Sequence, residues 1–131
     1  MTGEQTIVVV DKDENIVSAF RGFLAREGVC MVPSPSAAAA SAMLETRTAD
    51  LLIIDIGIPV DLGLNFVRDV RRKHPSLPII AITGYTESVS EREVKALGAS
   101  FFFAKPLDLD RLRDAVRRSL PLKHVPVNRF R

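Results

Sequence analysis

Leu51-Leu52-Ile53-Ile54-Asp55-Ile56-Gly57-Ile58-Pro59 is the stretch that decides the fold of this chain. Four large apolar residues run without a polar break and end at an aspartate, which a loop containing glycine and proline follows. A continuous apolar run is typical of a parallel sheet that helices cover on both faces, because neither face of such a strand tolerates water. The stretch therefore predicts a buried strand with a carboxylate at its carboxyl end.

Four further runs share this character, and segments with helical spacing separate them. The runs are Ile7–Val10, Val29–Val32, Ile79–Ile82 and Phe101–Ala104. The apolar stripes between them are Ile16, Phe20, Phe23 and Leu24; Ala37–Leu44; Leu64, Val67 and Val70; Val94 and Leu97; and Leu109, Leu112, Val116 and Leu120. Ser36 is a predicted N-cap, and Gly28, Gly98 and Pro121 are predicted helix ends. Strand and helix thus alternate five times, which predicts an α/β fold: a flavodoxin-like, doubly wound parallel sheet of order 2-1-3-4-5 with helices on both faces.

Size and composition fit one soluble domain. The chain has 131 residues, of which 47% are hydrophobic and 26% charged. Its single cysteine, Cys30, excludes an internal disulfide and is read as a small core residue. We see no leader peptide and no apolar run near the roughly 20 residues that span a bilayer, so we expect a cytoplasmic protein without membrane contact.

The net charge of +2 is distributed unevenly. Between Arg111 and Arg131 there are seven Lys or Arg residues and one acid. Aromatic residues do not alternate with these cations, so we expect no nucleic-acid binding, and we interpret the segment as a solvated helix face followed by a tail. The predicted division is a domain over residues 1–121 and a basic tail over 122–131.

Charged and polar residues follow four of the predicted strands. They are Asp11-Lys12-Asp13-Glu14, Asp55, Thr83-Gly84 and Lys105-Pro106. The carboxyl ends of parallel strands meet at one edge, where such sheets bind ligands. Asp13 is well placed to cap the helix that follows, but Asp55 and Lys105 precede loops and have no helix to cap. A carboxylate, a lysine and a hydroxyl around one point suit phosphoryl transfer, in which the carboxylate attacks and the others neutralise the phosphoryl oxygens.

The same residues resemble the motifs of a two-component response regulator receiver domain, a CheY-like fold, over Thr6 to Leu120. The matching segments are Val9-Val10-Asp11, Leu51–Pro59 with Gly63, Ile82-Thr83-Gly84 and Gly98–Pro106. The resemblance implies that Asp55 is the phospho-acceptor, that Lys105 pairs with Asp55 or its phosphate, and that Thr83 bonds the phosphoryl group. Mg²⁺ would be held by Asp11, Asp55 and the backbone carbonyl of Gly57. Phe102 matches the rotating aromatic of the switch, with plain core packing as the alternative.

Lys12 departs from the family pattern, because receivers usually carry a second acid there as a direct metal ligand. An ammonium in that position removes a ligand and adds a positive charge, so we expect weak Mg²⁺ binding. Opposite charges about 4 Å apart attract by roughly 4 kcal/mol at an effective dielectric constant of 20, so a Lys12–Asp55 pair would compete with the metal. Asp13 is the candidate substitute ligand, although a shift of one residue should turn its side chain away.

The resemblance implies a stand-alone response regulator that takes its phosphoryl group from a sensor histidine kinase or a phosphotransfer protein. The signal would leave through a downstream protein, and the resemblance allows a homodimer through the fourth helix, fifth strand and fifth helix. At most it would catalyse its own phosphorylation and dephosphorylation. Lys12 favours the main alternative, a pseudo-receiver that binds proteins without phosphorylation. A haloacid-dehalogenase-like phosphatase is a weaker alternative, since Asp108 and Asp110 start a helix instead of ending a strand.

Overall fold

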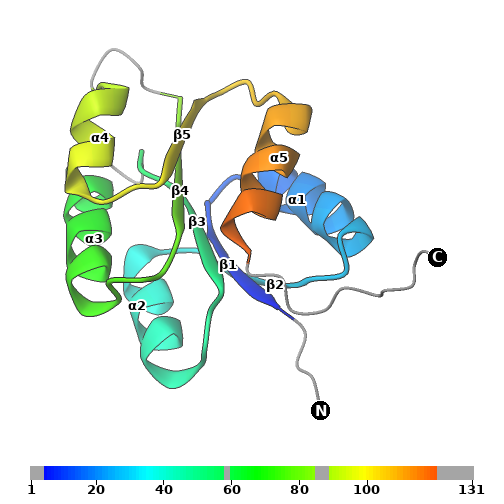
Figure 1. The fold of residues 1–131 in the computed structure, drawn as a ribbon, viewed down its shortest axis with the longest axis horizontal. Coiled ribbons are helices and arrows are strands. Elements are labelled where there is room, and N and C mark those ends of the chain that lie inside the picture. The colour runs from blue at the N-terminus through cyan, green and yellow to red at the C-terminus, as the bar shows by residue number, and fades with distance from the viewer. Residues whose placement is uncertain (1–4, 58–59, 85–88, 121–131) are drawn as a thin grey trace.

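Five parallel strands form one central sheet in the computed structural model, which describes residues 5–57, 60–84 and 89–120 (Figure 1). The strands are β1 (Thr6–Val10), β2 (Cys30–Ser34), β3 (Leu51–Asp55), β4 (Ile79–Thr83) and β5 (Phe101–Ala104). Their order across the sheet is β2-β1-β3-β4-β5, and every neighbouring pair is parallel. The predicted doubly wound sheet is therefore confirmed, and all carboxyl strand ends lie at one edge.

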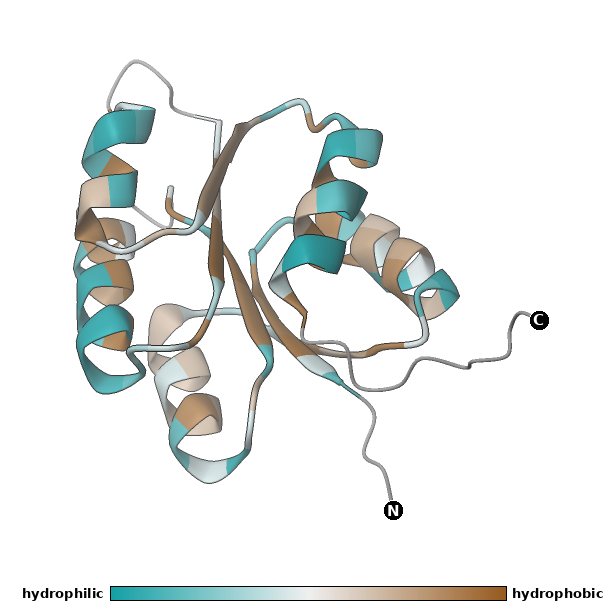
Figure 2. Cartoon of the chain, viewed as in Figure 1, coloured by the Kyte–Doolittle hydropathy of each residue, from teal (hydrophilic) through white to brown (hydrophobic). Residues whose placement is uncertain are grey.

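Two layers of helices cover the sheet. The helices are α1 (Glu14–Arg26), α2 (Ala37–Thr46), α3 (Val60–Lys73), α4 (Glu91–Leu97) and α5 (Leu109–Ser119). In Figure 1, α1 and α5 lie on one side of the strands and the other three helices lie on the opposite side. In Figure 2 the strands of the sheet are mostly brown, whereas the helices carry both teal and brown bands, as helices with one face toward a core do. Among the described residues, no helix has the length and apolarity that crossing a bilayer requires.

Alternation along each strand produces two separate cores. Val8 and Val10 of β1 pack with the buried side chains of α2, α3 and α4. Ile7 and Val9 of the same strand pack with those of α1 and α5. Because side chains point to opposite faces with a period of two, one continuous apolar run supplies both cores.

Burial differs between the central and the edge strands. Every residue of β3 and β4 is buried, as the continuous apolar runs predict. The edge strands β2 and β5 are only partly buried, and Pro33 of β2 is exposed. The same correction applies to Leu109, which we expected on the apolar stripe of α5 but which is 47% exposed. A residue of an edge strand has a strand neighbour on one side only, and Leu109 is the first residue of its helix, so an apolar residue at these positions does not imply burial.

The helix ends follow the predicted signals. The Asp13 side chain caps α1 and the Ser36 hydroxyl caps α2. Gly28 follows α1 with a φ of +73°, a left-handed conformation that favours glycine. Pro121, the predicted end of the last helix, and the tail 122–131 lie outside the described residues, as do Ile58 and Pro59.

Arg71 joins α3 to the turn after α4. Its Nε and Nη2 donate to the Gly98 carbonyl at 3.1 and 2.7 Å. Its Nη1 donates to the carbonyls of His74 and Pro75 at 3.1 and 2.9 Å. A Cβ on Gly98 would lie 2.7 Å from the Arg71 side chain, so the close approach requires glycine. One half-buried guanidinium thus satisfies carbonyls of two turns that are distant in sequence.

Candidate functional site

Asp11, Asp55 and Lys105 meet at the carboxyl edge of the sheet. Asp11 follows β1, Asp55 ends β3, and Lys105 follows β5. The Lys105 Nζ lies 2.8 Å from Asp55 Oδ2 and 3.3 Å from Asp11 Oδ2. Three residues that are far apart in sequence thus form one charged cluster, at the place where the topology of the sheet predicts a binding site.

The Asp55 carboxylate is held at both oxygens. Its Oδ1 accepts a hydrogen bond from the Gly57 backbone N–H at 2.8 Å, and its Oδ2 accepts one from Lys105. The helix α3 packs tightly behind this loop, because a Cβ on Gly63 would lie 2.2 Å from the Ile56 carbonyl oxygen. Only glycine permits that approach, so Gly63 fixes the backbone directly after Asp55. The Asp55 side chain is 12% exposed and therefore stays within reach of a ligand.

Asp11 is the more buried of the two acids, with 4% of its surface exposed. Its Oδ1 accepts a hydrogen bond from the Asp13 backbone N–H at 2.9 Å. Its Oδ2 is buried and has no hydrogen-bond donor, although Lys105 lies at ion-pair distance. Burial raises the pKa of Asp11, and the charge of Asp55 raises it further, against the Asp13 N–H and Lys105. The pocket therefore contains a carboxylate oxygen that is poorly compensated.

Lys105 carries the positive charge of the cluster. Burial alone would lower its pKa, but the hydrogen bond and charge of Asp55, together with Asp11, outweigh burial and raise the pKa. The Lys105 backbone N–H donates to the carbonyl of Thr83 at 2.8 Å, which ties the end of β5 to the end of β4. Thr83 itself is fully buried at this edge. The structure thus brings together the predicted carboxylate, lysine and hydroxyl residues.

Lys12 does not form the expected pair with Asp55. Lys105 occupies that position, while Lys12 is exposed and forms no hydrogen bond or ion pair with any residue in the described ranges. Asp13 is also exposed, and its Oδ1 accepts from the Asn15 backbone N–H at 2.9 Å. The capping role predicted for Asp13 is confirmed, and this role commits the side chain that was the candidate substitute ligand.

The donor set fits a divalent ion bound through few protein ligands. Mg²⁺ prefers oxygen ligands and is commonly held by one or two carboxylates together with water and phosphate. Asp11 offers a buried oxygen without a donor, and Asp55 offers a second carboxylate beside the Gly57 backbone. Within the described residues, no group of three or more His, Cys, Asp or Glu side chains gathers as a metal cage. The fit is therefore to an ion that keeps much of its water.

Phe102 and its neighbours alternate across β5. Phe102 packs against the core beneath α2, α3 and α4, whereas Phe101 and Phe103 pack against the core beneath α1 and α5. All three are partly buried. Phe102 thus lies on the α4 side of the strand that leads to Lys105, and its switching role remains a prediction.

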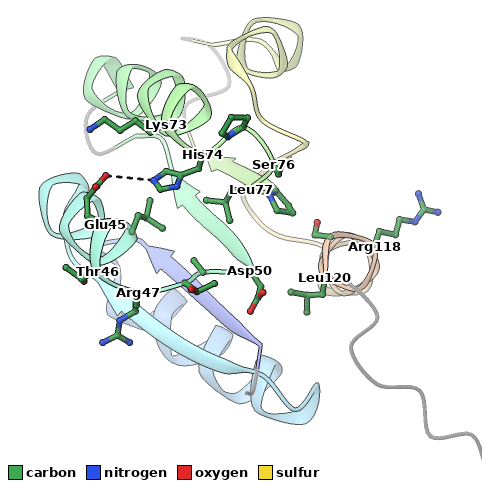
Figure 3. Close-up of a pocket in the computed structure, with 16 residues that line it drawn as sticks. Glu45, Thr46, Arg47, Asp50, Lys73, His74, Ser76, Leu77, Arg118 and Leu120 are labelled. Carbon is green, nitrogen blue, oxygen red and sulfur yellow. Dashed lines mark ion pairs between the residues drawn. The ribbon is translucent and has the colours of Figure 1, made fainter. Parts of the chain in front are cut away.

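A hollow of about 860 Å³ lies at the amino ends of the strands, opposite Asp11, Asp55 and Lys105. Residues that precede β3 and β4 line it, together with the ends of α2, α3 and α5 (Figure 3). Inside it, His74 Nε2 lies 4.0 Å from Glu45 Oε2, and the labelled cations Arg47, Lys73 and Arg118 point in different directions. None of the clustered acids lines this hollow, so its size does not make it the chemical site.

Sequence reasoning missed two features of the site. It did not foresee that Lys105 would bridge both acids, nor that Asp11 would keep an oxygen without a donor. The register between β1 and β3 explains why one lysine reaches both acids. Val10 pairs with Ile54, so the residues that follow them on the two strands, Asp11 and Asp55, come side by side. It correctly placed Asp108 at a helix start, where its Oδ1 accepts from two backbone N–H groups of α5. That position removes the acids that a haloacid-dehalogenase-like site would need.

Comparisons with known proteins agree with this geometry. Residues 7–117 match the model of the response regulator receiver domain. Sporulation initiation phosphotransferase F of Bacillus subtilis is 30% identical over 91% of this chain and 96% of its own length. The chain spans about a quarter of several longer relatives, such as the regulatory protein AlgB of Pseudomonas putida, at 27% identity over 91% of this chain and 27% of that protein.

Solved structures extend the likeness to the fold. The response regulator protein TrrA of Thermotoga maritima, solved in complex with Mg²⁺-BeF, has a TM-score of 0.78 and 28% identity, covering 88% of this chain and 99% of that one. The beryllofluoride-activated NtrC4 receiver domain dimer has a TM-score of 0.81 and 23% identity, covering 88% and 95%.

Proposed function

This chain belongs to the response regulator receiver domain family, and from that premise we propose that Asp55 is the residue that accepts the phosphoryl group. Members of this family are phospho-accepting signalling domains of two-component systems, not enzymes with an external substrate. The observation that supports Asp55 is its 2.8 Å contact with Lys105, beside the second acid Asp11. Asp55 is the only carboxylate in the described part of β3 and its loop.

The transfer is a substitution at phosphorus. An Asp55 oxygen forms a bond to phosphorus while the bond from phosphorus to the donor's histidine nitrogen breaks, and the electron pair returns to that nitrogen. Lys105 then pairs with the phosphoryl oxygens in place of the free carboxylate, and the Thr83 hydroxyl bonds another oxygen. Lys105 and Thr83 act electrostatically, since neither of them forms or breaks a covalent bond during the transfer.

Receiver domains bind Mg²⁺, which supplies positive charge to the phosphoryl oxygens when it is bound. In this chain we propose that Asp11, Asp55 and the Gly57 carbonyl hold the ion. Asp11 Oδ2 supports that assignment, because it is buried without a donor and a cation would satisfy it. Lys105 already lies 3.3 Å from this oxygen, so the ion has to share the acids with a resident ammonium.

Partners follow from the same proposal. The donor is a sensor histidine kinase or a phosphotransfer protein in the cytoplasm, and the signal leaves through a protein that reads the phosphorylated form. Phe102 lies on the α4 side of β5, so we propose that its packing couples Thr83 to the surface formed by α4, β5 and α5. A homodimer through that surface is the proposed assembly.

Substitution of the acceptor tests the proposal. The protein and its Asp55→Asn variant are incubated with acetyl phosphate and Mg²⁺, and the intact masses are measured. We expect one phosphoryl group on the protein and none on Asp55→Asn, while Asp13→Asn, whose side chain only caps α1, behaves like the unmodified protein. A mass gain in Asp55→Asn equal to that of the unmodified protein contradicts the assignment. No gain in any form would favour the phosphorylation-independent pseudo-receiver that Lys12 suggested.

A further inference from the structure

Lys12 is a cation without a partner at the edge of a strongly charged site. Of the three charged residues that follow β1, Asp11 is buried beside Lys105, and Asp13 caps α1. Lys12 is exposed and unpaired with respect to every residue that the structure describes. Its charge is therefore available to a ligand.

The acids of the site use the charge of Lys105 before any phosphoryl group arrives. Asp11 and Asp55 carry two negative charges, and Lys105 Nζ lies within 3.3 Å of both. A phosphoryl group carries on the order of two negative charges at neutral pH, and its bond to Asp55 removes the charge of that carboxylate, so the site gains about one negative charge. Once Asp55 is phosphorylated, one ammonium faces Asp11 and the phosphoryl oxygens together. The site is then short of positive charge, and a nearby ammonium that is not already paired would be favourable.

Lys12 lies within reach of that position. The register pairs Val10 with Ile54, so Asp11 comes beside Asp55 and Lys12 follows one residue later. Neighbouring strands are about 4.8 Å apart, and consecutive Cα atoms are about 3.8 Å apart. An extended lysine side chain spans about 6 Å, which covers the distance to a group attached to Asp55.

The geometry points to Lys12 as a phosphoryl-binding residue of this chain, which contacts the oxygens of the incoming phosphoryl group and of phosphorylated Asp55. This inference rests on the proposed acceptor role of Asp55. Lys12 thereby supplies part of the positive charge that a divalent ion otherwise provides, so phosphorylation proceeds at low Mg²⁺. Lys12 acts on the phosphoryl group, not on the free carboxylate, which Lys105 already binds.

Phosphorylation with and without Mg²⁺ tests this role. Initial rates are measured by intact mass against acetyl phosphate concentration, in excess EDTA and in saturating Mg²⁺, for the protein, Lys12→Gln and Lys12→Arg. Lys73→Gln is the matched control, because Lys73 is also exposed but lies at the far edge of the sheet. In EDTA we expect Lys12→Gln to be about tenfold slower at low acetyl phosphate, with Lys12→Arg and Lys73→Gln near the unmodified rate. In Mg²⁺ the difference should fall below about threefold.

The outcomes separate the inference from the proposed function. If Lys12→Gln matches the unmodified protein in EDTA, or if the unmodified protein requires Mg²⁺ absolutely, Lys12 does not bind the phosphoryl group, while Asp55 remains the acceptor. If the unmodified protein takes no phosphoryl group in either condition, the proposed function fails, and the role of Lys12 fails with it. Because Lys12 is exposed, its variants should keep the melting temperature of the protein, and circular dichroism checks this.

Discussion

Removing the charge of Asp11 should stabilise the protein. In Asp11→Asn, the side-chain carbonyl still accepts the Asp13 N–H, so the start of α1 is kept. What disappears is the charge on Oδ2, a buried oxygen that has no hydrogen-bond donor. An unsatisfied buried polar group costs about 1–3 kcal/mol, and the attraction to Lys105 at 3.3 Å offsets part of that cost. We therefore expect a net gain of about 1 kcal/mol at pH 7.5 without Mg²⁺, or about 4 °C in melting temperature for a domain of this size.

The stability gained by Asp11→Asn should increase as the pH rises. Burial raises the pKa of Asp11 in the folded state above 3.8, so the folded state holds this proton more tightly than the unfolded chain does. The stability contributed by this group therefore falls as the pH rises from about 4 through the folded pKa. Asn does not titrate, so the advantage of Asp11→Asn should be absent near pH 3.5 and reach its full size above the folded pKa.

Urea unfolding in EDTA at several pH values between about 3.5 and 8 measures this difference. Asp13→Asn is the control, since Asn and Asp cap helices about equally well and its stability should stay within about 0.5 kcal/mol of the unmodified protein. The reasoning is refuted if Asp11→Asn is less stable than the unmodified protein at pH 7.5, or if its advantage is the same at every pH.

Three further predictions concern Lys12, Arg71 and the tail. Lys12→Asp should tighten Mg²⁺ binding by about tenfold, which is about 1.4 kcal/mol, in isothermal titration, and equal affinities would show that Lys12 does not weaken the metal site. Arg71→Ala should lower the free energy of unfolding by about 2 kcal/mol, because carbonyls of two turns lose their donor. Arg72→Ala removes an exposed pair with Asp69 and should cost at most about 0.5 kcal/mol; similar losses for both would contradict the contacts of Arg71. Deletion of residues 122–131 should shift the melting temperature by only a degree or two, about 0.5 kcal/mol, and a large drop would mean that the tail contributes to the fold or to an assembly.

The fold could be predicted because periodicity in this chain is unambiguous. Leu51–Ile54 and Ile79–Ile82 are apolar at every position and short, and that combination is typical of a strand covered on both faces. The edge strands were harder, since Val29–Val32 has the same composition as a central strand but has a strand neighbour on one side only. The composition of a strand shows which surroundings it can tolerate, whereas the exposure of its side chains depends on whether the strand lies at the centre or at the edge of the sheet.

The members of the candidate site and its Lys105–Asp55 pair were predictable, but the positions of the other charged side chains were not. Parallel topology brings Asp11, Asp55 and Lys105 to one edge whatever the details of their side chains. We expected both Lys105 and Lys12 to face Asp55; the Lys105 pair is present, whereas Lys12 is exposed, because the direction of a side chain at a strand end cannot be read from sequence. The contacts of Arg71 left no sequence signal, because its acceptors are backbone carbonyls, one of them 27 residues away.

Pro33 has a consequence for how this protein meets others. It lies in β2, at one open edge of the sheet, where the strand could otherwise template the addition of a further strand from another molecule. A proline has no N–H to donate, and in sheets it is tolerated where its nitrogen faces outward. A sixth strand arriving there would find a gap in the hydrogen-bonding ladder at the fourth residue of a five-residue edge. Proline therefore disfavours strand-by-strand growth at β2. Association with other molecules would use the helical surfaces or the other edge strand, β5.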